Sequence, residues 1–139
     1  MNSDDAARLV INSIRKVVKK GDLEEARHLL ENKDIQETLS SYHVTNYEDF
    51  MIVPVTGLLN KVEEFSYGIR DVVENYNQLV LDYQDALFIC QSLCMPGSLT
   101  ILKQVYDGLM KIRGVLVGSL LVPETTILYR TLTDSNLPF

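Results

Sequence analysis

Few residues in this chain have the types and spacing that metal binding requires. Glu24 and His28 stand four positions apart, so on a helix their side chains share a face and could contact one ion. No third ligand lies near them in the sequence, and the other histidine, His43, is isolated. Because a metal site needs several ligands that converge at fixed geometry, we expect no metal and no cofactor.

Two pairs of carboxylates are the remaining candidates for acid–base chemistry. Glu63 and Glu64 are adjacent, so on a helix they point in different directions. Asp82 and Asp85 share a face, but nothing apolar and enclosed accompanies them to raise a pKa. We therefore interpret both pairs as parts of solvated helix faces.

The two cysteines, Cys90 and Cys94, are too few for a fold built on disulfides. Four residues apart on a helix they are badly placed for bridging, so we interpret both as buried thiols in a reducing, intracellular compartment, with the cytoplasm favoured over the nucleus. Cys90 lies among apolar residues, which is the wrong setting for an activated thiolate. The sequence also lacks the common nucleotide-binding, serine-hydrolase and zinc-protease motifs, so we expect no enzymatic activity.

Composition favours a globular helical protein that does not bind nucleic acid. The chain has 139 residues, of which 46% are hydrophobic and 23% charged, with a net charge of -6 that repels phosphate backbones. The most apolar stretch, 114–122, is too short to span a bilayer, and no signal peptide is evident at the N-terminus. A basic cluster fits the C-terminal end of a helix, where the helix dipole favours cations: Arg15, Lys16, Lys19 and Lys20.

Helix-period apolar stripes run along the whole chain and predict an all-α fold, a bundle of about six to seven short-looped helices. In the N-terminal third, a first helix begins after Ser3, and Gly21 is a natural residue to follow its end. Asp22 and Asp34 each precede a glutamate by three residues, which predicts that they cap the second and third helices.

Further along, Pro54 is expected to end a run, and Thr56 to cap a long fourth helix with Gly68 in its middle. A break at Asn75 and Asn77 then leads into a fifth helix over roughly 79–94. A turn at Pro96–Gly97 and a cap at Ser98 predict the start of a sixth helix, which ends or bends at Gly114 and Gly118. A terminal helix over 124–132 is expected to start after Pro123.

The C-terminal half carries more apolar helix surface than a domain of this size is expected to bury. Either this surface packs entirely within the chain, or part of it forms an interface built from helices. We favour the interface, formed by self-association or with a protein partner, and predict that it contains Leu99, Leu102, Val105, Tyr106, Leu109, Met110, Val115, Leu116, Leu120 and Leu121.

Two segments, 29–43 and 93–106, share an apolar spacing around a short turn. Segment 29–43 begins with Leu29 and Leu30 and ends in His43, and it resembles the junction of the second and third helices in the Lin-two/Lin-seven heterodimerisation domain of membrane-associated guanylate kinase scaffolds. Segment 93–106 resembles the same junction, although it lacks the histidine. The resemblance implies tandem three-helix modules at 4–50 and 56–113 that pair with matching modules of partner proteins.

The sequence as a whole predicts a single all-helical domain, 1–139, or two small units with a C-terminal extension at 114–139. The expected function is a non-enzymatic interaction or oligomerisation module of scaffold or adaptor type, which assembles a complex by helix packing. A first alternative is a helical-bundle regulator that binds a partner's peptide helix in an apolar groove, as apoptosis-type or viral mimic bundles do. A second alternative is a small helical enzyme or ligand binder.

Overall fold

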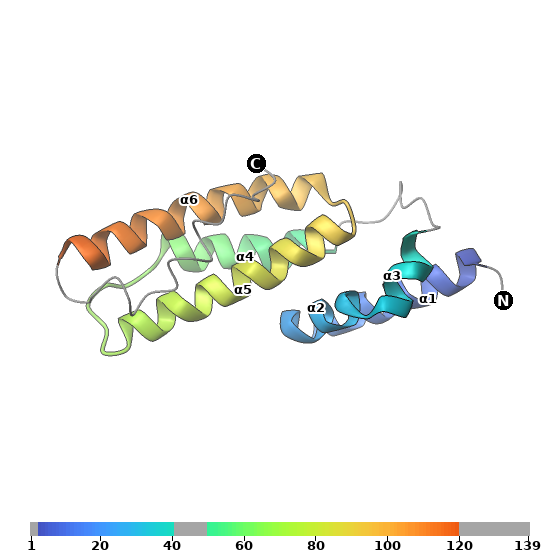
Figure 1. Ribbon diagram of the computed structural model, residues 1–139. Coiled ribbons are helices and arrows are strands. Elements are labelled where there is room, and N and C mark those ends of the chain that lie inside the picture. Colours follow the sequence, from blue (N-terminus) through green and yellow to red (C-terminus); the bar gives the residue numbers. More distant parts are fainter. Residues whose placement is uncertain (1–2, 41–49, 120–139) are drawn as a thin grey trace.

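The computed structural model describes residues 3–40 and 50–119, and in these residues it contains six α-helices and no strand, which confirms the all-α fold. The helices are α1 (Ser3–Lys19), α2 (Leu23–Glu31), α3 (Lys33–Ser40), α4 (Ile52–Glu63), α5 (Val72–Ser92) and α6 (Pro96–Gly118). In Figure 1, α4, α5 and α6 lie side by side, and the three N-terminal helices gather beside α5. The main contact between these two groups is the packing of α2 on α5.

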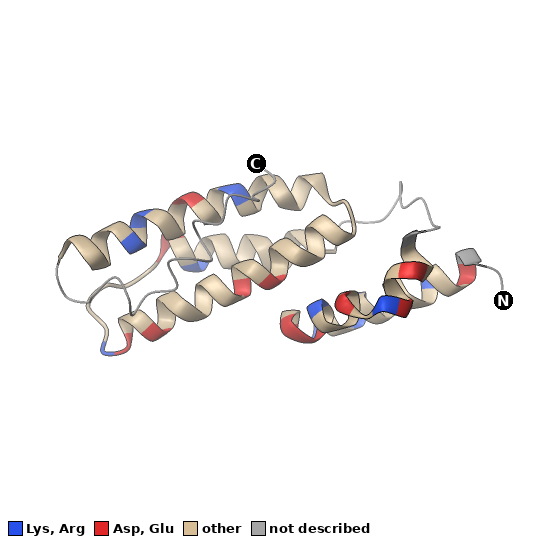
Figure 2. Ribbon diagram, viewed as in Figure 1, with Lys and Arg blue, Asp and Glu red and all other residues tan. Residues whose placement is uncertain are grey.

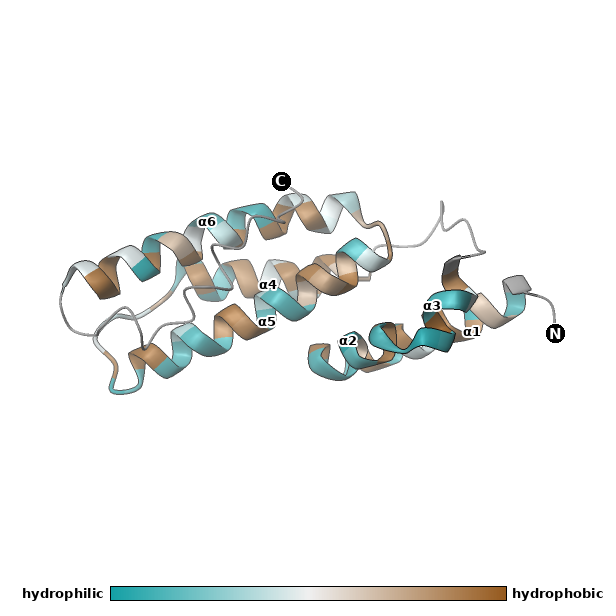
Figure 3. Ribbon diagram, viewed as in Figure 1, coloured by the Kyte–Doolittle hydropathy of each residue, from teal (hydrophilic) through white to brown (hydrophobic). Residues whose placement is uncertain are grey.

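The apolar stripe on α6 faces the core, whereas α1 leaves Leu9 exposed. On α6 the buried residues follow one another at intervals of three or four, which is the spacing of one helix face: Ser98, Leu102, Val105, Leu109, Ile112 and Leu116. Helix α5 is buried on more than one side because it contacts α2, α4 and α6. The apolar bands on α4, α5 and α6 are visible in Figure 3. One cluster of buried residues extends through α1, α2, α4, α5 and α6.

Local signals set the turn between α1 and α2 as predicted. Gly21 has a φ of 83°, a conformation that glycine adopts without steric cost. Asp22 then caps α2, and its Oδ1 accepts a hydrogen bond from the backbone N–H of Glu25 at 3.0 Å. The prediction for the third helix is wrong by two residues. Asn32 occupies the capping position there, because its Oδ1 accepts hydrogen bonds from the backbone N–H groups of Asp34 and Ile35.

The predicted boundaries around α4 are also wrong. Helix α4 begins at Ile52, so Pro54 lies in its first turn, where the backbone N–H has no partner within the helix, and Thr56 is an interior residue. The helix ends at Glu63, and Gly68 belongs to the connection between α4 and α5. The predicted break at 75–77 does not exist, since both asparagines lie inside α5.

Helix α6 begins earlier than predicted and ends at Gly118, one of its two predicted ends. Pro96 is its first residue and Met95 stands at the capping position, so Ser98 lies inside the helix and is fully buried. Gly114 is an interior residue, and the helix continues to Gly118. The predicted helix over 124–132 lies outside the described residues.

Close contact between α4 and α6 depends on Gly108. A Cβ atom added at this position would overlap Cγ1 of Val62, which is buried on the facing side of α4. No neighbouring atom comes within 4 Å of the corresponding position at Gly114, on the same helix. The close approach of α4 and α6 therefore occurs at Gly108.

Candidate functional site

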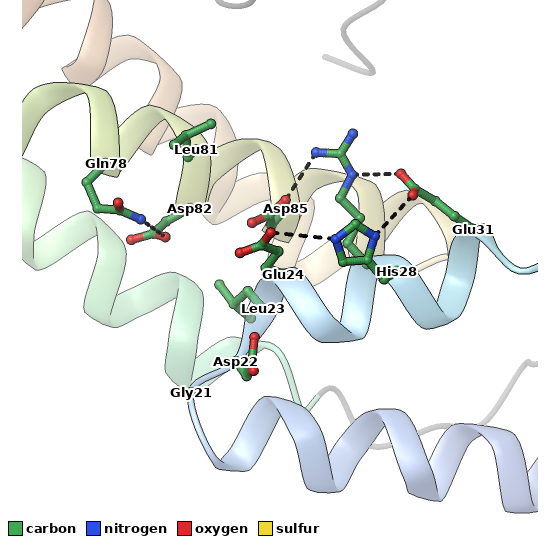
Figure 4. Close-up of a pocket in the computed structure, with 11 residues that line it drawn as sticks. Gly21, Asp22, Leu23, Glu24, His28, Glu31, Gln78, Leu81, Asp82 and Asp85 are labelled. Carbon is green, nitrogen blue, oxygen red and sulfur yellow. Dashed lines mark hydrogen bonds and ion pairs between the residues drawn. The ribbon is translucent and has the colours of Figure 1, made fainter.

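A cleft of about 510 Å³ lies between α2 and α5 (Figure 4). One wall begins at the turn before α2 and continues along that helix, and the other wall is the second to fourth turns of α5. The lining contains five carboxylates, one guanidinium, one imidazole and two leucines: Gly21, Asp22, Leu23, Glu24, Arg27, His28, Glu31, Gln78, Leu81, Asp82 and Asp85. Figure 2 shows acidic residues on both helices in this region.

Arg27 is the centre of the polar contacts in the cleft. Its Nε donates to Oε1 of Glu31 at 3.0 Å, and its Nη1 donates to Oδ1 of Asp85 at 3.1 Å. The guanidinium carbon lies 5.6 Å from the centre of the Phe88 ring, within the range of a cation–π interaction. The ion pair with Asp85 joins α2 to α5 and holds the Arg27 side chain against the α5 wall.

The pKa values of the two partners of this ion pair are both raised, but for different reasons. The pKa of Arg27 is raised, chiefly by its hydrogen bond to Asp85. The pKa of Asp85 is also raised, because desolvation by burial outweighs the opposing effect of Arg27. The different balance follows from exposure: the side chain of Arg27 is 37% exposed and that of Asp85 only 12%. The carboxylate therefore carries most of the cost of removing the pair from water.

The structure corrects the prediction that Asp82 and Asp85 both lie on a solvated face. Asp85 is buried, whereas Asp82 is half-buried and accepts a hydrogen bond from Nε2 of Gln78 at 3.0 Å. One sequence signal pointed to this result, since the apolar residues Phe88 and Ile89 widen the face of α5 beyond one stripe. A helix that packs on two sides buries polar positions that a single apolar stripe would leave in water.

His28 lies between two glutamates, and their arrangement does not suit a metal ion. Its Nε2 is 3.6 Å from Glu24 and its Nδ1 is 3.6 Å from Glu31, so the carboxylates approach opposite nitrogens of the ring and do not converge. These contacts become ion pairs only when the imidazole is protonated. No cluster of metal-ligating side chains occurs in 3–40 and 50–119.

The other chemical candidates do not meet in space. Glu63 and Glu64 are exposed at the end of α4. Cys90 is buried as predicted, but Cys94 is exposed, because α5 ends at Ser92 and Cys94 lies in the connection to α6 with a φ of 53°. His43 lies outside the described residues.

The predicted interface residues fall into several groups. Leu102, Val105, Leu109 and Leu116 are fully buried, so in this structure they belong to the core of the chain and not to an open surface. Leu99, Tyr106 and Met110 are partly buried against that core. Val115 is 49% exposed, and Leu120 and Leu121 lie outside the described residues.

Another groove, of about 400 Å³, runs between α4 and α6. Its apolar lining includes Leu59, Val62, Tyr67 and Ile112, and Gly108 lies beside them. Polar side chains complete the lining: Glu63, Gln104, Asp107 and Lys111. This groove has a larger apolar share than the cleft between α2 and α5 and a smaller excess of acidic groups.

Among the described residues, none of the helices is both long enough and apolar enough to cross a bilayer. Comparison with protein family models, characterised proteins and solved structures finds no match to this chain. The resemblance of segments 29–43 and 93–106 to the Lin-two/Lin-seven domain therefore stays a prediction.

Proposed function

We propose that the chain is a non-enzymatic, helical protein-interaction module of scaffold or adaptor type. The observation that carries this proposal is the open cleft between α2 and α5, in which the half-exposed Leu81 and the half-buried Leu23 lie among charged side chains. Leu81 is 45% exposed although its helix is otherwise packed on several sides. Apolar anchors surrounded by polar groups, on rigid helices, are the usual composition of a protein docking surface.

The cleft between α2 and α5 is a different surface from the apolar stripe of α6, which the sequence favoured for binding. The apolar stripe of α6 already stabilises the chain itself, since each buried leucine contributes about 2 kcal/mol. Replacing Leu102 or Leu109 by alanine is expected to lower stability whether or not a partner binds. Binding is better tested at residues whose side chains the fold leaves accessible.

The second candidate function is a receptor for a partner's peptide helix, with the groove between α4 and α6 as its site. The observation that favours it is that half-buried Leu59 and exposed Tyr67 both line that groove. An amphipathic helix binds such a groove through apolar side chains spaced three and four residues apart. The two functions differ in which face of the chain meets the partner.

Site-specific photo-crosslinking in the source cells separates the two. A photoreactive residue is placed at Leu81 in the cleft, at Gln104 in the α4–α6 groove, or at Lys103, which is exposed and lines neither site. The proposal expects a discrete protein adduct from position 81 and none from 103. In extracts, excess unlabelled wild-type chain should compete with this adduct, and excess Leu81→Ala chain should compete poorly.

Adducts from position 104 alone would favour the peptide-helix receptor. Adducts of equal yield from 81 and 103 would contradict a defined docking site. An adduct of twice the chain's own mass would identify the partner as a second copy.

A further inference from the structure

We infer that the occupant of the α2–α5 cleft is a basic segment of a partner protein, one that presents apolar side chains to Leu23 and Leu81 and lysines or arginines to the carboxylates that lie between them. This inference rests on the proposed function and specifies the chemistry of the partner. It follows from the shape of the cleft, from its charge and from the way its own cation is held.

The cleft has a net negative charge. Five carboxylates and a single guanidinium line the cleft. That guanidinium is already engaged, because Arg27 donates to both Glu31 and Asp85 and lies over Phe88. Lys19 and Lys20 precede the cleft in the sequence but do not line it. The acidic excess is thus left for a ligand to neutralise.

The carboxylates of the cleft have hydrogen-bonding capacity that the chain itself does not use. An ionised carboxylate has about four acceptor positions. Asp22 Oδ1 is used by the backbone of Glu25, and Asp82 Oδ1 by the side chain of Gln78. Acceptors therefore outnumber the donors that the cleft itself supplies, and the groups that bring donors together with positive charge are lysine and arginine side chains.

The apolar part of the cleft favours a protein segment over a simple cation as its occupant. Leu23 and Leu81 come from opposite walls, and both line the cleft. In Figure 4, the carboxylates of Glu24, Asp82 and Asp85 lie between Leu23 on one wall and Leu81 on the other. A partner segment that contacts both leucines would place its cations between them, near carboxylates on both walls. We expect a helix whose basic residues are flanked by leucines to satisfy both requirements.

Three synthetic peptides of one length test this inference by fluorescence anisotropy. The first is an amphipathic helix with lysines flanked by two leucines. The second replaces its lysines by glutamates, and the third replaces its leucines by serines. The first peptide should bind the intact chain at least tenfold more tightly than either of the others, and its affinity should fall as salt is added.

Two charge reversals of equal size locate the binding. Asp82→Lys changes a residue of the cleft, and Glu64→Lys makes the same change at the exposed end of α4. The inference expects about tenfold weaker binding of the first peptide to Asp82→Lys and little change for Glu64→Lys, with circular dichroism showing that both variants stay folded. Equal losses in the two variants would mean attraction by the net charge alone and would overturn the inference. Equal binding of the lysine and glutamate peptides would overturn it too.

The crosslinking experiment distinguishes failure of the basic-partner inference from failure of the proposed function. If the partner captured from position 81 is crosslinked through an acidic or neutral segment, the proposed interaction function is supported and the inferred basic character of the partner is refuted. Absence of any adduct from position 81 would refute the docking function itself.

Discussion

Replacing Gly108 by alanine should destabilise the chain although alanine is the better helix former. In a helix interior, alanine is favoured over glycine by about 1 kcal/mol. At position 108, however, the new Cβ would overlap Cγ1 of Val62. Val62 is buried and β-branched, so it has few alternative rotamers. Overpacking of this kind costs about 1–3 kcal/mol, so we expect a net loss of about 1 kcal/mol.

Urea unfolding followed by far-UV circular dichroism measures this change, and Gly114→Ala is its matched control. Gly114 lies in the same helix with no neighbour within 4 Å of an added Cβ, so its replacement should raise the free energy of unfolding by about 0.5–1 kcal/mol. The two glycine substitutions thus have opposite expected signs.

A second variant isolates the steric cause. Val62→Ala removes the overlapping methyl group and should itself cost stability, because it leaves a cavity. In that background Gly108→Ala should become neutral or stabilising. If Gly108→Ala stabilises the wild-type chain as much as Gly114→Ala does, the close approach of α4 and α6 at this residue is refuted.

Four further outcomes are expected. In urea titrations, Arg27→Ala should lower the free energy of unfolding by about 2 kcal/mol, because it leaves the buried carboxylate of Asp85 without its partner. Asp85→Ala should lower it by only about 1 kcal/mol, because Arg27 is partly exposed and stays paired with Glu31. Equal losses in the two variants would contradict this expectation. Because the folded-state pKa of Asp85 lies above its unfolded value, the native state holds more protons on this group, and its contribution to stability falls as pH rises from about 4; Asp85→Asn should flatten that part of the stability–pH curve. Asn32→Ala should cost about 1 kcal/mol and more than Asp34→Ala in thermal unfolding, a ranking that the capping site predicted from sequence would reverse. Tyr83→Phe should raise stability by about 1 kcal/mol in calorimetry, because the Tyr83 hydroxyl is buried without a hydrogen-bond partner in the described part of the chain; a loss would reveal a partner.

Features that depend on neighbours in the sequence were predictable. The turn at Gly21 and Asp22 needs only a glycine and a capping aspartate, both of which act within one helical turn. The stripe of α6 follows from helical spacing alone, which is why the all-α fold and the buried face of α6 are confirmed. The boundary at Pro54 was ambiguous, because proline both ends helices and suits their first turn.

The candidate site depends on contacts between distant segments, and sequence patterns carry little of that information. Glu24 and His28 were recognisable as a pair on one helix face. Arg27 and Asp85 are 58 positions apart, and only the packing of α2 on α5 brings them together. The same packing leaves Leu81 exposed on the α5 wall of the cleft, opposite Leu23 on the α2 wall, whereas the apolar stripe of α6 is used inside the chain.

The joint between α2 and α5 has a consequence for the dynamics of the chain. Helices α1 and α3 pack chiefly on each other and on α2, so α1–α3 can open as one cooperative unit while α4–α6 keep their own packing. Amide hydrogen exchange should then be faster in α1–α3 than in the buried turns of α5 and α6. A segment bound in the cleft would touch both units, and its binding energy would have to be overcome before they part. Slower exchange throughout α1–α3 would thus report an occupied cleft, even at amides far from the ligand.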